Sequence, residues 1–598
     1  MAEQPPGPVE PHDEKVIPLK EAKARRDRAA KAPKRKPNGA GNGVDHAPDA
    51  LTAPPLPLDD DEFRCLGYDH GTFFFLGRRS GQIVPLTASA LSSEGNLLEL
   101  APLDWWEAHF PKKGGFVRTE AVNALISACL EKRVFDIGRV RGRGAWWDDG
   151  RAILHIGDAL VLDGRRYRIS GFQSRYIYEE AASFDVLDVA PLANADAPKL
   201  LKLCEHLMWE RPYMAHLLAG WCVVAPICGA LLWRPHLWII GESGSGKSVL
   251  QDRIIKPALA GIALCVQSKT TEAGIRQALK SDARPVLFDE GESETPSDRS
   301  RMQSVIDLAR AASTEGGAPI AKGGQTGIGH QYQVRSAMCF LSIAPMLTHQ
   351  ADENRFTVLR LLGQSDHTKE GKAVHAEHFA RLEGLIATTI TTDFPSRLLA
   401  RSIELMPTIR HNALAFARAA AEVMPSRRNA DQIGVLLAGA AALEHGDKLT
   451  AKEAVACVLA LGWIDEAAIE AAREPDHVKL ITYLCQQVIT VRPRMGAPHD
   501  LSIGELIGGA LENEDHDIHL RRIGIRVDRG DGHVWFANTH QGLANLLAAS
   551  PWAGAWAVIL GRHTYARKSD NPVRYTTGTK TRAIGIPYAI VTGQATEL

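Results

Sequence analysis

An eight-residue, glycine-rich loop constrains this chain of 598 residues more than any other stretch. It reads Gly241-Glu242-Ser243-Gly244-Ser245-Gly246-Lys247-Ser248. The apolar run Trp238–Ile240 precedes it, and Val249–Ile255, which can be helical, follows. A strand, such a loop and a helix in this order form a phosphate-binding loop, because the glycines let backbone N–H groups face phosphate oxygens. We therefore expect all eight residues to bind ATP, with Lys247 directed at its β and γ phosphates.

A second motif, at 285–290, is an apolar strand that ends in two carboxylates, Asp289 and Glu290. We expect Asp289 and the hydroxyl of Ser248 to hold Mg²⁺, the usual partner of ATP in such sites. Glu290 is then placed to orient or deprotonate the attacking water. The two motifs together predict hydrolysis of the bound ATP.

Two further candidates follow on the next strands. The apolar strand Ala337–Ser342 ends in a hydroxyl; in P-loop motors of the AAA+ kind a residue at this place senses the γ-phosphate or positions water, so Ser342 is the candidate. Arg355 stands just before another strand, from where an arginine can stabilise the transition-state charge in a neighbouring subunit. The alternative for Arg355 is a salt bridge to Asp352 or Glu353.

The segment 320–334 consists of two polar, strand-like pieces around a glycine-rich turn. It predicts a hairpin that projects from the motor, with Lys322 and His330 on its strands and Thr326 near its tip. Such a hairpin can grip the backbone of single-stranded DNA without reading its bases. The alternative is an ordinary surface hairpin.

The chain is too long for one hydrophobic core. We expect an α/β fold, a P-loop NTPase core with a parallel sheet, flanked by an N-terminal α+β domain, a helical subdomain and a C-terminal winged-helix-like α+β module. The C-terminal interpretation rests on a helix followed by two strands around a basic glycine turn at 529–532. The expected parts are a disordered basic tail at 1–61, the N-terminal α+β domain at 62–196, a helical lead-in at 197–235, the motor at 236–368, the helical subdomain at 369–475 and the C-terminal module at 476–598.

Composition limits the partners and the cellular compartment that we expect for the protein. The net charge is −1, with 45% hydrophobic and 23% charged residues, so contact with nucleic acid requires local patches. Nine cysteines without a C-x-x-C motif argue against a zinc ribbon or disulfide scaffold and fit a reducing cytoplasm. The uncharged stretch 217–233 contains glycines and a proline, and we expect a buried helix pair there and no contact with a membrane.

Two local patches are candidates for nucleic-acid contact. Lys15–Lys36 holds ten basic residues against two acidic ones, which fits phosphate contacts or an ordinary solvated tail. Between Arg141 and Gly150, arginines stand beside Trp146 and Trp147 on a glycine-rich loop. These residues could stack on bases and hold phosphates, or the tryptophans could belong to the core and its rim.

The order of motifs resembles superfamily 3-type helicases, in particular the DNA primase/helicase proteins of phages, plasmids and integrated elements. The resemblance covers Ala215–Leu361 and includes Trp233–His236, the loop, Thr271–Ala278, Ala283–Glu290, the hairpin and Asn354–Phe356. It implies a hexameric ring, ATP at subunit interfaces and a hairpin lysine on single-stranded DNA. Lys322 and Arg355 are the positions that match those roles.

The chain departs from that family in two ways. The family usually has Asn where Ser342 stands, and we find no convincing primase constellation, so a separate primase is a possible partner. The preferred hypothesis is an ATP-dependent DNA helicase or translocase for replication of a mobile element. The alternatives are an AAA+-type ATPase that loads or remodels protein or acts as a defence switch, and a regulatory DNA-binding protein that uses nucleotide as a switch.

Overall fold

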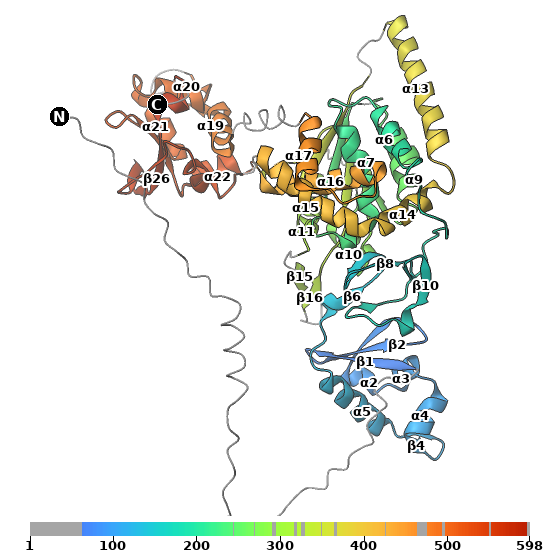
Figure 1. Ribbon diagram of the computed structural model, residues 1–598. Helices are drawn as coiled ribbons and strands as arrows, with labels where there is room; N and C mark the ends of the chain where they lie inside the picture. Colours follow the sequence, from blue (N-terminus) through green and yellow to red (C-terminus); the bar gives the residue numbers. More distant parts are fainter. Residues whose placement is uncertain are drawn as a thin grey trace, which may run out of the picture. The chain divides into compact units, whose positions relative to one another are not determined.

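The structure is a computed structural model of the full chain, shown in Figure 1. The N-terminal tail, with its basic stretch, lies outside the described residues. The described residues are 62–242, 244–267, 269–289, 295–315, 320–323, 329–347, 350–363, 368–424, 426–462, 475–492, 497–548, 550 and 552–594.

The centre of the motor is a five-stranded parallel sheet with the order β13-β14-β17-β12-β18. Its strands are β12 (His236–Gly241), β13 (Leu264–Gln267), β14 (Val286–Asp289), β17 (Met338–Ser342) and β18 (Phe356–Leu361). All five run in the same direction. The expected α/β core with a parallel sheet is therefore present, and the strand that precedes the glycine-rich loop lies between β17 and β18.

Both faces of this sheet are covered, which is why the middle residues of β12, β14 and β17 are apolar and do not alternate with polar residues. Alternate side chains of β12 enter different clusters. Leu237 and Ile239 pack with Leu250 and Ile254 of the helical segment after the loop. Trp238 and Ile240 pack on the other face, against α10 (Glu272–Leu279) and α11 (Pro296–Ala312).

The helical subdomain packs on the first of these faces. Its helices in the expected range are α13 (Lys369–Thr389), α14 (Phe394–Glu404), α15 (Met406–Val423), α16 (Arg427–Glu444) and α17 (Ala451–Ala460). Buried residues of α14, α15 and α16 share one hydrophobic cluster with α6 (Pro198–Glu205) and α7 (Met214–Val224). Among the described residues, every helix is too short or too polar to cross a membrane.

Helices α7 and α16 approach each other so closely that their contact needs glycine. A Cβ atom on Gly220 would lie 1.9 Å from the carbonyl oxygen of Leu436, and one on Gly439 would lie 2.2 Å from the carbonyl oxygen of Gly220. Since α7 is buried along almost its whole length, this contact anchors the helical subdomain to the motor.

Residues 62–196, expected as one domain, contribute to separate cores. The first part contains strands β1 (Phe63–Asp69), β2 (Thr72–Gly77) and β3 (Ile83–Thr87), and its helices include α5 (Arg118–Glu131). They surround their own cluster, which includes Phe75, Trp106 and Leu125. Residues from 145 onwards belong to the cluster of the motor. The break in the core therefore falls near residue 135, whereas one cluster continues across residue 196.

The second part of this segment forms an antiparallel sheet with the order β10-β9-β8-β7. Its strands are β7 (Gly144–Asp148), β8 (Arg151–His155), β9 (Ala159–Leu162) and β10 (Arg165–Arg168). The chain before β7 runs beside the chain that enters β14, with the N–H of Gly142 donating to Ser281 and the N–H of Ala283 donating to Arg143. Sequence periodicity carries no signal for such a pairing between distant segments.

The C-terminal module has its own hydrophobic cluster. It begins with α19 (Asp476–Gln486), the hairpin β19–β20 (Val488–Val491, His499–Ser502), α20 (Ile503–Gly509) and α21 (Glu514–Ile523). The hairpin β21–β22 (Ile525–Asp528, His533–Ala537) follows, then α22 (Gln541–Leu547). The expected helix and strand pair are present, α21 was missed, and β23 (Arg567–Lys568) and β26 (Ala583–Pro587) extend the sheet. The winged-helix interpretation stays a prediction.

Replacing Gly220 by Ala should destabilise the motor. The added methyl group overlaps backbone atoms of α16, and overpacking of this kind costs about 1–3 kcal/mol. As a matched control, Gly384→Ala lies on exposed α13 with no atom within 4 Å of the new Cβ, so it should be neutral or stabilising by up to about 1 kcal/mol. Differential scanning calorimetry measures both, and an unchanged melting temperature for Gly220→Ala would contradict the close contact.

Candidate functional site

The glycine-rich loop connects the C-terminal end of β12 to the helical segment that begins with α8 (Lys247–Val249). Gly244 and Gly246 have φ angles of +82° and +90°, which only glycine adopts without strain. A Cβ on Gly241 would lie 2.5 Å from the hydroxyl oxygen of Ser245, so this position also needs glycine. The helical segment continues through a π-helical stretch, Leu250–Ile255. Ser243 lies outside the described residues.

Two polar side chains of the loop, those of Lys247 and Ser245, are the candidates for contact with an anion. The ammonium of Lys247 donates to the carbonyl oxygens of Gly241 and Glu242, the latter at 3.0 Å. The hydroxyl oxygen of Ser245 is buried and has no hydrogen-bond partner within the part of the chain that the structure describes. A buried hydroxyl beside an ammonium and glycine backbone fits a phosphate group, which would satisfy both.

Asp289 ends β14 at the same edge of the sheet as the loop. The strand pairs place Phe288 beside Phe340 and Ser342 beside Ile240, so the ends of β14, β17 and β12 lie level. Two strand spacings, about 10 Å, separate Asp289 from the end of β12. A metal ion with its water shell can bridge such a gap to the hydroxyl of Ser248. Asp289 also affects the helical segment after the loop. The pKa of Lys256 is raised, mainly because of the hydrogen bond to Asp252, and the negative charge of Asp289 raises it further.

Glu290, the predicted water activator, lies outside the described residues, so its role stays a prediction. Ser342 is described and buried. Its hydroxyl donates to the carbonyl oxygen of Ala344 at 2.7 Å and accepts from the indole N–H of Trp238 at 2.7 Å. Contact with a nucleotide or its water would use the remaining lone pair or require release of Ala344.

Arg355 lies at the opposite edge of the sheet. It precedes β18, whose first residue pairs with His236, whereas the last residue of β18 pairs with Gly241. The length of β12, about 17 Å, therefore separates Arg355 from the loop of its own chain. Burial lowers the pKa of Arg355, the positive charges of Arg428 and Arg310 lower it further, and Asp352 opposes them.

In the alternative role of Arg355, a salt bridge to Asp352, Arg355 would compete with other partners of that carboxylate. The buried carboxylate of Asp352 accepts hydrogen bonds from Arg310 and Gln303, both at 3.1 Å. Arg310 and Arg428 are thus neighbours of Arg355 that sequence analysis missed. Each comes from a helix distant in sequence, and no motif marks them.

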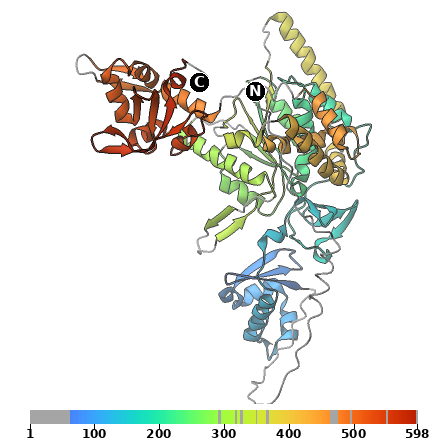
Figure 2. The same cartoon turned by 60° about the vertical axis from the view of Figure 1, so that its left-hand side comes forward.

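The hairpin expected at 320–334 is present as β15 (Ile320–Gly323) paired with β16 (Gly329–Tyr332). Lys322 and His330 are paired positions in the backbone register of the two strands, and Thr326 lies outside the described residues. Figure 2 shows the hairpin projecting from the motor. Its ends connect to α11 and β17 at the N-terminal edge of the parallel sheet, the edge that carries Arg355.

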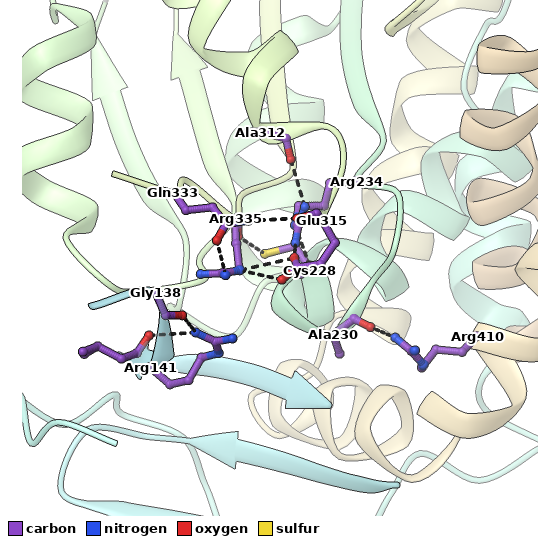
Figure 3. A network of polar contacts seen from close by, with 11 residues as sticks. Gly138, Arg141, Cys228, Ala230, Arg234, Ala312, Glu315, Gln333, Arg335 and Arg410 are labelled. Carbon is purple, nitrogen blue, oxygen red and sulfur yellow. Dashed lines mark hydrogen bonds and ion pairs between the residues drawn. The ribbon is translucent and has the colours of Figure 1, made fainter. Parts of the chain in front are cut away.

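A network of arginines fixes the base of the hairpin (Figure 3). The carboxylate of Glu315, before the hairpin, accepts hydrogen bonds from Arg234 and from Arg335, which follows the hairpin. Arg234 is fully buried and also donates to the carbonyl oxygens of Cys228 and Ala312. Its backbone N–H donates to Ser313 at 2.7 Å. The chain that enters β12 is therefore joined to both ends of the hairpin.

His236, the first residue of β12, completes this base. Its Nδ1 accepts the backbone N–H of Met338 at 3.0 Å, so its Nε2 carries the proton and donates to the hydroxyl of Ser313 at 3.1 Å. Burial lowers the pKa of His236 to about 3. The neutral ring thus connects β12, β17 and the end of α11.

The tryptophan-containing loop is not an open base-stacking platform. Trp146 is 2% exposed, and its indole N–H donates to the carbonyl oxygen of Gly142. The guanidinium of Arg141 is buried between the rings of Trp146 and Tyr176, and burial lowers its pKa to about 10. Arg143 makes a two-pronged ion pair with Asp282. Of the two interpretations, the core interpretation therefore holds for Trp146.

No family model matches the sequence, and no curated protein matches it. The solved structures that it resembles include helicases. The helicase SCCmec type IV Cch matches at 12% identity and a TM-score of 0.42, over 89% of this chain and 95% of that chain. The NrS-1 C-terminal region matches at 13% identity and 0.27, over 74% and 95%. The JCV helicase matches at 9% identity and 0.22, over 37% and 65%. Likenesses at these values assign no role to any residue.

The buried state of His236 predicts a pH dependence of stability. A histidine in the unfolded chain titrates near 6.5, whereas the folded ring stays neutral down to about pH 3. The unfolded state therefore binds the extra proton as the pH falls below about 6.5, and stability is lost towards acid at up to about 1.4 kcal/mol per pH unit. His155, whose pKa is lowered by burial to about 4, acts in the same direction.

His236→Asn keeps a donor and an acceptor but removes this titration, so its stability should fall less steeply between pH 6.5 and 4. Urea unfolding at a series of pH values measures the slope. Equal slopes for His236→Asn and the unmodified protein would refute the assignment.

Proposed function

We propose that the protein is an ATP-dependent DNA helicase or translocase that hydrolyses ATP between subunits and grips single-stranded DNA with the hairpin β15–β16. One observation carries this proposal. The nucleotide loop lies at one edge of the parallel sheet, whereas Arg355 and the base of the hairpin lie at the other. A second copy of the chain would be needed to bring Arg355 to the γ-phosphate.

The residues present fit ATP and Mg²⁺. The loop offers glycine N–H groups, the ammonium of Lys247 and the buried hydroxyl of Ser245, which lacks a partner among the described residues. Ser248 and Asp289 would hold Mg²⁺, which neutralises charge on the phosphates when bound. Glu290 follows Asp289 in sequence and would receive a proton from the attacking water. Arg355 from the neighbouring subunit would stabilise the charge that develops on the γ-phosphate.

The hairpin gives the ring its proposed grip on DNA. Its base is fixed to the chain that enters β12, and β12 ends at the glycine-rich loop, so this one strand connects the loop to the hairpin. Six identical chains arranged as a ring would point six hairpins towards one strand. Replication of a mobile element with a separate primase is the setting that we propose for this motor.

Single-stranded DNA should stimulate hydrolysis, and Lys322→Ala should abolish the stimulation while the basal rate remains. Steady-state ATPase rates with and without an oligonucleotide measure this directly. Lys452→Ala, an exposed lysine on α17, is the matched control and should retain full stimulation. If DNA has no effect on the rate of the unmodified protein, the motor hypothesis fails and an ATPase with a protein partner becomes the better interpretation.

In assemblies that mix the two proteins, Arg355→Ala subunits should lower the ATPase rate of the unmodified subunits. If Arg355 acts on the ATP of a neighbour, adding the variant to unmodified protein lowers the rate more than in proportion to its share. ATPase titration at constant total protein, with sizing chromatography to count subunits, measures the effect. Glu290→Gln, which should bind ATP and scarcely hydrolyse it, is the comparison for a loss within one subunit's own site. A linear decline with Arg355→Ala would place its action within one chain.

A further inference from the structure

The outer edge of the antiparallel sheet carries an unusual strand. Strand β10 pairs only with β9, and all four of its residues, Arg165, Arg166, Tyr167 and Arg168, are exposed. Its place at the edge of the sheet can be followed in Figure 1. In a chain whose net charge is −1, three cations within four residues make a concentrated positive surface.

These three arginines differ from the other arginines of the same region. Arg143 and Arg151 make ion pairs with Asp282 and Asp148. Arg165, Arg166 and Arg168 have no ion-pair partner in the part of the chain that the structure describes. The nearest acidic residue in sequence, Asp163, lies in the turn before β10. Their charges are therefore available to a ligand.

An exposed aromatic ring lies among these charges. Tyr167 is 39% exposed, and its ring centre lies 6.0 Å from that of Phe172 at an angle of 66°. The guanidinium of Arg151 lies 5.1 Å from the centre of the Phe172 ring. An open hollow of about 490 Å³ adjoins these rings. It is lined by Arg151, Leu162, Tyr167, Arg168, Gly171, Phe172 and Gln173.

We propose that β10 and this hollow form a second binding site for single-stranded DNA, separate from the hairpin. The arginines contact phosphates, and Tyr167 stacks on a base. Charge alone is a common protection of sheet edges, but it does not account for an exposed tyrosine braced by a second ring. Positive side chains interleaved with an aromatic ring are the combination that binds single strands without sequence preference.

The same features favour a single strand over other anionic partners. In a duplex the bases are stacked inside, so Tyr167 would find no base face. An acidic protein would use the arginines and leave the ring unused. The inference extends the proposed function by taking single-stranded DNA as the partner, but it does not require that ATP hydrolysis depend on the hairpin.

The test is binding of a fluorescein-labelled oligo-dT to the full chain without nucleotide, measured by anisotropy over a range of salt concentrations. The triple variant Arg165→Gln, Arg166→Gln, Arg168→Gln should bind more weakly. The slope of log affinity against log salt should fall in size by about 2, since each lost phosphate contact in a single strand removes about 0.7. Tyr167→Ala should lower affinity at least about fivefold with the slope unchanged, and Tyr167→Phe should restore it.

A matched triple variant controls for loss of net charge. Arg381→Gln, Arg418→Gln and Lys452→Gln remove three exposed cations from α13, α15 and α17, and they should change neither affinity nor slope. Equal slopes for the β10 triple variant and the unmodified protein would overturn the site. Equal loss of binding to poly-glutamate, together with no effect of Tyr167→Ala on oligo-dT, would overturn its assignment to DNA.

The outcomes separate this inference from the proposed function. If the β10 variants bind normally while DNA still stimulates hydrolysis through Lys322, the second site is wrong and the motor stands. If the β10 variants lose affinity while DNA never stimulates hydrolysis, the site stands and the motor is wrong.

Discussion

The carboxylate of Glu315 between Arg234 and Arg335 is the interaction on which the motor's geometry most depends. Arg234 is fully buried, and a buried cation without its counter-charge costs about 3–5 kcal/mol. Burial lowers the pKa of Arg234, and Glu315 opposes this shift. The three side chains come from the chain before β12, the end of α11 and the chain after the hairpin. Because one carboxylate contacts both guanidiniums, it joins these three segments to one another.

The parallel sheet explains why this network lies at the opposite edge from the glycine-rich loop. Parallel strands collect their C-terminal ends at one edge, and the loop at Gly241, Ser342 and Asp289 therefore meet there. The same rule collects the strand entries, the hairpin and Arg355 at the other edge. The glycine-rich loop and Arg355 therefore lie on opposite sides of the sheet, and under the proposed function Arg355 would reach only the ATP of another subunit.

Local motifs could be predicted from the sequence, but partnerships between distant segments could not. The glycine-rich loop, the strand ending at Asp289 and the hairpin around Lys322 each depend on neighbouring residues, and all three are present. The tryptophan loop was ambiguous, because Trp146 packs against Arg335 from a distant segment as well as against Arg141 of the loop itself. The network at Glu315 has no sequence signature, since its members are ordinary charged residues far apart in the chain.

Other differences had signals that sequence analysis passed over. Helix α21 begins at Asn513, whose side chain caps it, and ends at Gly524 with a φ angle of +90°. These are recognisable start and stop residues, but the helix is too polar for hydrophobic periodicity to reveal it. The division of residues 62–196 between two cores has no such signal in the sequence. It arises because β7 pairs and packs with the chain that enters β14, a segment far away in the sequence.

The pairing of the chain before β7 with the chain before β14 also determines how the protein can be dissected. A fragment that begins at the helical lead-in would lack β7, and Trp146, Ala283 and Gly229 would lose their mutual packing. The apolar core beside the parallel sheet would then be open to water on one side. A fragment that keeps this core closed should therefore begin before residue 140 and retain α16. Residues 62–131 have their own core, but Leu66, Phe74, Leu76 and Ile83 also pack against Phe135, Val140 and Ile177, so their removal would expose that second cluster.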